Sequence, residues 1–74
     1  MAIKELDAKG LKTQQLLLNI TFEISSMQPG DILKVVSDIA TFEDDVTNWC
    51  NKNNKTIKQI EDMGRRVKQC EILA

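Results

Sequence analysis

The chain has 74 residues, of which 42% are hydrophobic and 28% are charged, and its formal net charge is −1. This balance is typical of a globular domain and excludes an intrinsically disordered segment. A chain of this length buries only about 60% of its unfolded surface, so we expect residues 1–74 to form a single domain with one compact core.

The residue types that the chain lacks exclude several kinds of site. It has no histidine and only two cysteines, Cys50 and Cys70, so we expect neither a metal site nor another cofactor. The absence of histidine also removes the most common general base. No apolar run approaches the ~20 residues that span a membrane, and residues 1–10 lack the hydrophobic part of a signal peptide. We therefore expect a cytoplasmic protein that does not bind a membrane.

The first half of the chain predicts a strand followed by a helix. Residues 2–7 alternate weakly between polar and apolar side chains, which indicates a short strand. Residues 13–27 are predicted to be helical, because Leu17, Ile20, Ile24 and Met27 recur at spacings of three and four and therefore share one face, which Leu16 widens. We expect Thr13 to be the N-cap of this helix. The sequence QPGD at 28–31 then predicts a turn.

A second strand and a second helix are expected next. Residues 32–37 are rich in β-branched side chains, which favours a strand. Asp38 is predicted to cap a helix over about residues 39–51. The helical spacing places four side chains on its buried face: Phe42, Val46, Trp49 and Cys50.

The C-terminal part predicts a β-hairpin. Residues 55–61 and 66–73 flank a turn expected at Asp62, Met63 and Gly64, and strand alternation makes Cys70 face the core. The element order is therefore β-α-β-α-β-β. We expect an α/β fold, more narrowly an α+β two-layer sandwich, in which two helices cover one face of a four-stranded mixed sheet and the first two strands are parallel.

Charge is unevenly distributed along the chain. Residues 1–50 carry four lysines against eight acidic side chains, whereas residues 51–74 carry six basic side chains against three acidic ones. This asymmetry is typical either of a solvated strand face or of a docking face for an acidic protein partner. We do not expect a nucleic-acid partner, because the only aromatic residues are Phe22, Phe42 and Trp49, and two of these face the predicted core.

Four short motifs give the chain a resemblance to a known family. They are LDAKGLK at 6–12, MQPGD at 27–31, VVSD at 35–38 and the late glycine at position 64. In this order and spacing they resemble the TusA/SirA family of small sulfur-carrier proteins, and the register holds from about Leu6 to Gly64 without an insertion or a deletion. The fold that the resemblance implies is the same β-α-β-α-β-β sandwich.

The resemblance also implies what occupies the family's reactive site. The family carries a Cys-Pro-x-Pro motif whose cysteine accepts a persulfide sulfur from a desulfurase and passes it on. Here the equivalent residues are Thr13, Gln14, Gln15 and Leu16, and Lys12 takes the place of the preceding basic residue. Threonine cannot form a persulfide, so we expect no catalytic residue at this position and no sulfurtransferase activity from it.

Two hypotheses about function follow. In the first, the chain is a non-catalytic TusA-like module that binds or regulates a protein of sulfur relay or redox chemistry. The residues expected to bind that partner are Lys12, Thr13, Gln14, Gln15, Arg65 and Arg66. In the second, the chain is an active sulfur carrier that uses Cys70 or Cys50. Both thiols are more simply interpreted as core residues, and the helix C-terminus near Cys50 disfavours a thiolate there. The oligomeric state is left open.

Overall fold

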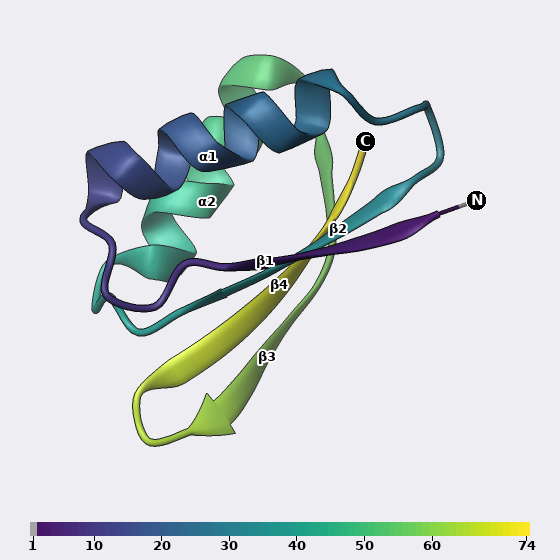
Figure 1. The fold of residues 1–74 in the computed structure, drawn as a ribbon. Coiled ribbons are helices and arrows are strands. Elements are labelled where there is room, and N and C mark those ends of the chain that lie inside the picture. The colour runs from purple at the N-terminus through teal and green to yellow at the C-terminus, as the bar shows by residue number, and fades with distance from the viewer. Residues whose placement is uncertain (1) are drawn as a thin grey trace.

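The computed structural model describes residues 2–74, which form two helices and four strands (Figure 1). In chain order these are β1 (Ile3–Asp7), α1 (Thr13–Ser25), β2 (Ile32–Ser37), α2 (Phe42–Asn53), β3 (Thr56–Gly64) and β4 (Val67–Leu73). The predicted order β-α-β-α-β-β is confirmed.

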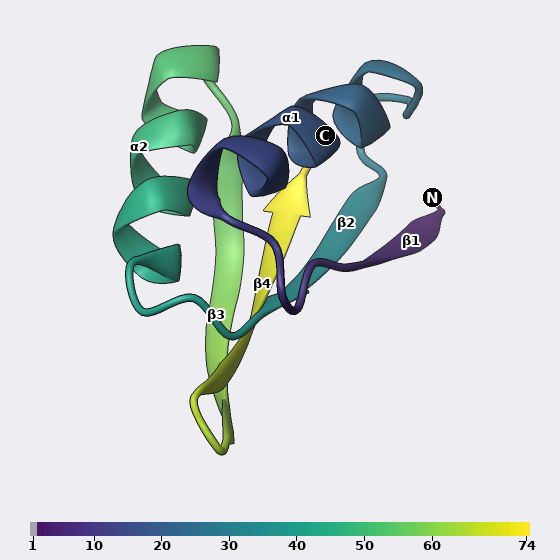
Figure 2. The same ribbon diagram turned by 60° about the vertical axis from the view of Figure 1, so that its left-hand side comes forward.

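The four strands form one mixed sheet in the order β1-β2-β4-β3. β1 and β2 run parallel, whereas β4 is antiparallel to both β2 and β3. Both helices lie on the same face of this sheet, as Figures 1 and 2 show from two directions. The sequence-based prediction of a two-layer α/β sandwich is therefore confirmed. A consequence of the strand order is that the last strand, β4, lies in the middle of the sheet.

The core fills the space between the helices and the sheet. Its buried side chains come from α1 (Leu16, Ile20, Ile24), from α2 (Phe42, Val46, Trp49, Cys50), from the strands (Leu33, Val35, Cys70, Ile72) and from Ala8. Each large apolar side chain buried here contributes about 1.5–3 kcal/mol. The predicted buried face of α2 is confirmed. The predicted apolar stripe of α1 also faces the core: Leu16, Ile20 and Ile24 are buried, and Leu17 and Met27 pack against them partly buried.

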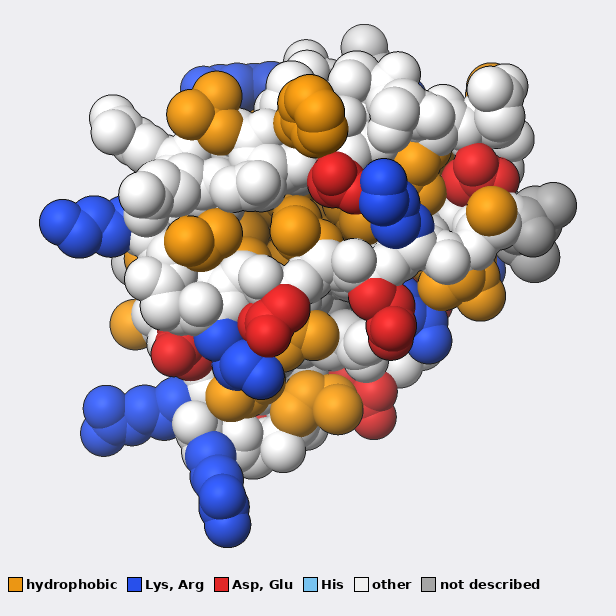
Figure 3. Space-filling model, in the orientation of Figure 1, with side chains coloured by type: hydrophobic (Ala, Val, Ile, Leu, Met, Phe, Trp, Pro, Cys, Tyr) orange, Lys and Arg blue, Asp and Glu red, His pale blue; other side chains and the backbone are white. Residues whose placement is uncertain are grey.

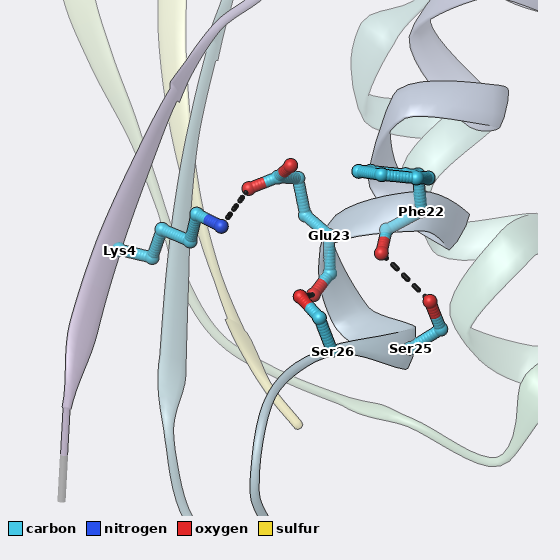
Figure 4. Close-up of polar contacts among 5 residues, drawn as sticks. All are labelled: Lys4, Phe22, Glu23, Ser25 and Ser26. Atoms are coloured by element: carbon cyan, nitrogen blue, oxygen red, sulfur yellow. Dashed lines mark hydrogen bonds and ion pairs between the residues drawn. The ribbon is translucent and has the colours of Figure 1, made fainter.

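Both helices have boundaries that differ from the predicted ones. α1 ends at Ser25, two residues before the prediction, with Ser26 as its C-cap. The hydroxyl groups of Ser25 and Ser26 donate to the carbonyl oxygens of Phe22 and Glu23, at 2.7 and 2.9 Å, and so compete with continuation of the helix (Figure 4). α2 begins at Phe42 with Thr41 as its N-cap, so the prediction that Asp38 caps this helix is wrong. The carboxylate of Asp38 instead accepts a hydrogen bond from the backbone N–H of Gly10, at 3.0 Å.

The hairpin turn also lies further along the chain than predicted. β3 continues to Gly64, which pairs with Val67, so the connection consists of only two residues, Arg65 and Arg66. Both arginines have positive φ, 55° and 65°, which is typical of a type I′ hairpin turn. A type I′ turn normally carries Asn or Gly at these two positions, so a turn made of two arginines could not be predicted from the sequence. A register shift between Asp62 and Gly64 marks a bulge just before the turn.

Candidate functional site

The N-terminal ends of α1 and α2 converge at one end of the molecule. In Figures 1 and 2 the loop before α1, the loop before α2 and the tip of the β3–β4 hairpin all lie at this end, whereas the start of β1 and the end of β4 lie at the other. The loops are joined by the bond from Gly10 to Asp38, and Gly10 has a φ of 83° that favours glycine. The helix N-termini carry partial positive charge, which makes this end suitable for an anionic group.

Thr13 lies at this end, but it is not the N-cap that the sequence predicted. The N-cap is Lys12, whose backbone is extended (φ −79°, ψ 166°), and Thr13 is the first helical residue. The Lys12 N–H donates to the side-chain oxygen of Gln15 at 3.2 Å, which stabilises the start of the helix. The hydroxyl group of Thr13 is therefore free of a capping role.

Asp45 of α2 holds the Thr13 hydroxyl group. The Oγ1 of Thr13 donates to Oδ2 of Asp45 at 2.9 Å, and the Oγ1 of Thr41 donates to the same oxygen at 2.7 Å. Thr13 and Asp45 are both half-buried. The carboxylate thus lies against the starts of both helices, where their dipoles favour a negative charge by typically 0.3–1 kcal/mol each. A hydroxyl group fits this position because it can donate a hydrogen bond to the carboxylate.

The hairpin is connected to the same end by an ion pair. Nζ of Lys68 on β4 lies 3.9 Å from the carboxylate of Glu43 in the first turn of α2. Beyond it, the exposed side chains of Arg65 and Arg66 form the tip of the hairpin. Figure 3 shows blue side chains projecting at the lower left of the molecule, over this part of the fold.

The six residues predicted to bind a partner therefore lie at one end but on two elements. Lys12, Gln14 and Gln15 are exposed at the start of α1, and Arg65 and Arg66 are exposed at the hairpin tip. Within residues 2–74, the ion pairs do not include Lys12 or either arginine. Their charges are directed to solvent and available to an acidic surface.

Both cysteines lie inside the core. Cys50 and Cys70 are free thiols, and each is almost fully excluded from solvent. Burial raises the pKa of Cys50, and burial together with the neighbouring Cys50 raises the pKa of Cys70 to about 12. The prediction that both side chains face the core is confirmed. Neither thiol has the exposure and low pKa that a sulfur acceptor needs.

The part of the chain that the structure describes contains no cluster of three His, Cys, Asp or Glu side chains that could hold a metal ion. None of the helices in that part is long and apolar enough to cross a membrane.

A comparison with known protein families identifies the family to which this chain is related. Residues 4–71 match the family model described as sulfurtransferase TusA. The chain belongs to the TusA family. The resemblance inferred from the sequence motifs is therefore confirmed over nearly the whole chain. A search among curated proteins gave no match.

Within this TusA-family fold, the sequence did not reveal Asp45 as part of the site. Asp45 is separated from Thr13 by 32 positions, and a contact of that range has no local sequence signal. The sequence did contain a hint of the second contact, since Thr41 and Asp45 are spaced four residues apart on a predicted helix.

Proposed function

We propose that residues 1–74 act as a single, cytoplasmic TusA-like domain that binds or regulates a protein partner without carrying sulfur. The observation that carries the proposal is the contact between Thr13 and Asp45 at the start of α1. By the family resemblance, position 13 is where the sulfur-accepting cysteine would lie. Here that position has no thiol, and a carboxylate occupies its immediate surroundings, which would repel an anionic sulfur group.

The residues of the partner surface follow from the same end of the molecule. Lys12, Thr13, Gln14 and Gln15 start α1, and the two hairpin arginines add positive charge that is not used in ion pairs within the described residues. A partner with an acidic surface, such as a protein of sulfur relay or redox chemistry, would match this charge. The contribution of such charges is expected mainly in specificity and association rate.

The alternative, a sulfur carrier that uses Cys70 or Cys50, has less support. A persulfide forms on a thiolate that a donor enzyme can reach, and both thiols are buried with raised pKa values. We expect neither to react with iodoacetamide in the native protein, and both to react in denaturant. Rapid alkylation of the native protein at either thiol would favour the alternative.

Sulfur loading tests the main proposal directly. The protein is incubated with a cysteine desulfurase and free cysteine, and its intact mass is then measured without reducing agent. We expect no gain in mass, whereas a family member with the Cys-Pro-x-Pro cysteine gains one sulfur atom in the same reaction. A stable gain of one sulfur atom by this chain would contradict the proposal.

Charge reversal tests the binding surface. Once a partner has been captured, the double variant Arg65→Glu/Arg66→Glu and the single variant Lys12→Glu are expected to weaken binding at least several-fold. Lys52→Glu is the matched control, because Lys52 is exposed in the last turn of α2, at the opposite end of the molecule. Equal effects of the control and the test variants would contradict the assignment of this surface.

A further inference from the structure

The tip of the β3–β4 hairpin carries bulky side chains on left-handed backbone. Arg65 and Arg66 have φ values of 55° and 65°, where the Cβ of an L-residue lies too close to the following carbonyl oxygen. At every other position in residues 2–74 where φ is positive, the chain has glycine or asparagine, which adopt this geometry more readily: Gly10, Gly30, Gly64 and Asn54. Strained residues of this kind cluster at functional sites, so the two arginines indicate a function at the tip.

The tip also projects beyond the rest of the sheet. β2 pairs with β4 only as far as Ser37, which lies opposite Lys68. The next pair of the hairpin, Val67 with Gly64, therefore has no third strand beside it. In Figure 2 the turn extends past both helices and past β1 and β2. The tip can thus enter a recess of another molecule that the rest of the domain does not enter.

The side chains at the tip are of types that bind at interfaces. Arg65 and Arg66 are exposed, and among residues 2–74 no ion pair includes either of them, although Asp62 is close in sequence. The carboxylate of Asp62 instead accepts a hydrogen bond from the N–H of Gly64 at 2.9 Å. Between these two residues, Met63 is 54% exposed. Arginine and methionine are enriched in protein interfaces, and a guanidinium group can bind a carboxylate through two parallel hydrogen bonds.

The acidic residues behind the tip favour a protein partner over a nucleic acid. Glu61 and Asp62 on β3 are exposed next to the turn, and they would repel the continuous negative charge of an RNA strand lying along the hairpin. The segment 61–67 also has no aromatic side chain on which a base could stack. A recess with carboxylates at its base would meet the two arginines and leave Glu61 and Asp62 outside.

We propose that the hairpin tip inserts into a carboxylate-lined recess of a protein partner, and that the chain keeps arginine at both turn positions for this contact at the expense of stability. The sequence Asn-Gly would form the same turn without strain, but it has no charge to bind a carboxylate. The partner is the acidic protein of the proposed function, on which this inference rests. What is added is the element that enters the partner and the chemistry that it meets there.

Thermal unfolding tests the strain. Arg65→Asn/Arg66→Gly keeps the type I′ turn and relieves the left-handed arginines, so its melting temperature, followed by circular dichroism, should rise by at least about 4 °C. The control is Arg65→Gln/Arg66→Gln, which removes the same charges but keeps a long side chain on the strained backbone, and it should rise less. An Asn-Gly variant that melts no higher than the native chain or the control would overturn the proposal.

Binding of an oligoglutamate peptide tests the chemistry of the tip. In nuclear magnetic resonance spectra of the native chain at low salt, the peptide should shift the amide signals of residues 63–67, and Arg65→Asn/Arg66→Gly should bind it at least about fivefold more weakly. Arg65→Lys/Arg66→Lys keeps the charge but loses the paired hydrogen bonds, so its affinity should lie between the two.

Three results of this titration would overturn the proposal. They are no binding, shifts that leave residues 63–67 unmoved, and equal or tighter binding at the tip of an oligouridylate of the same length. Failure at the tip is distinguishable from failure of the proposed function. Sulfur loading and Lys12→Glu test that function without using the tip, and a gain of one sulfur atom would end it whatever the tip binds.

Discussion

A thiol introduced at position 13 should have its pKa governed by Asp45. Thr13→Cys puts a sulfur atom at the start of α1, where the helix dipole favours the thiolate and lowers its pKa. The carboxylate of Asp45 opposes this effect, because its Oδ2 lies 2.9 Å from the present Oγ1 of Thr13. Restoring the cysteine without changing Asp45 should therefore give a poor nucleophile.

The magnitude follows from the distance. A sulfur atom is larger than oxygen, so the thiolate would lie about 4 Å from the carboxylate, where two like charges repel by about 1 kcal/mol in water and about 4 kcal/mol at an effective dielectric constant of about 20. Thr13 and Asp45 are half-buried, so we expect a value between these limits, about 2 kcal/mol. This corresponds to roughly 1.5 pKa units. The double variant Thr13→Cys/Asp45→Asn, which removes the charge, should have the lower thiol pKa by that amount.

The pH dependence of alkylation measures this pKa. Iodoacetamide reacts with the thiolate, and peptide mapping by mass spectrometry separates the introduced thiol from Cys50 and Cys70. With a desulfurase, the double variant should load sulfur faster than Thr13→Cys at neutral pH. Indistinguishable pKa values in the two variants would refute the role of Asp45.

Three further predictions concern stability. Two backbone N–H groups bonded to Asp31 hold its pKa below the ordinary value of 3.8, so the stability they confer is present above that pH and lost as pH falls through the lower folded-state pKa. The free energy of unfolding, measured with urea, should therefore fall less between about pH 7 and about pH 3 for Asp31→Asn than for the native chain. An equal fall in both proteins would contradict this prediction. Trp49→Phe removes the 3.0 Å hydrogen bond from the indole N–H to the Thr21 hydroxyl group and should lower the free energy of unfolding by about 1 kcal/mol. An unchanged free energy of unfolding would mean that this bond does not stabilise the fold. Burial raises the pKa of Cys70 from 9.0 to about 12, so stability should be retained below about pH 9 and decline toward pH 12. Cys70→Ala should reduce that decline in urea unfolding, and an unchanged decline would contradict the assignment.

The periodicity of apolar side chains was enough to predict the layers of the fold. Phe42, Val46 and Trp49 recur at helical spacing and are all buried on α2, and the buried Cys70 lies between two partly exposed polar neighbours, as a core strand residue should. These features are local, because each depends on residues within one or two turns. The parallel pairing of β1 with β2 could be predicted as well, because a helix connects the two strands and parallel neighbours are joined by such a crossover connection.

Features that depend on distant contacts could not be predicted in the same way. Asp38 has the chemistry of an N-cap, but the loop before α1 uses its carboxylate, and the helix begins at Phe42 instead. Thr13 has the chemistry of a cap as well, yet Asp45 binds its hydroxyl group across 32 positions. In both cases a side chain that could serve its own helix is taken by a partner from another segment.

The central position of β4 has a consequence for the chain as it is synthesised. β1, α1, β2 and α2 leave the ribosome before β4, but β2 then has one edge without its partner strand. An unpaired apolar edge can pair with strands of other nascent chains. The sheet is completed only when residues 67–73 emerge and insert between β2 and β3. Completion of the sheet therefore waits for β4, and a chain that stops before β4 lacks the strand that joins β2 to β3.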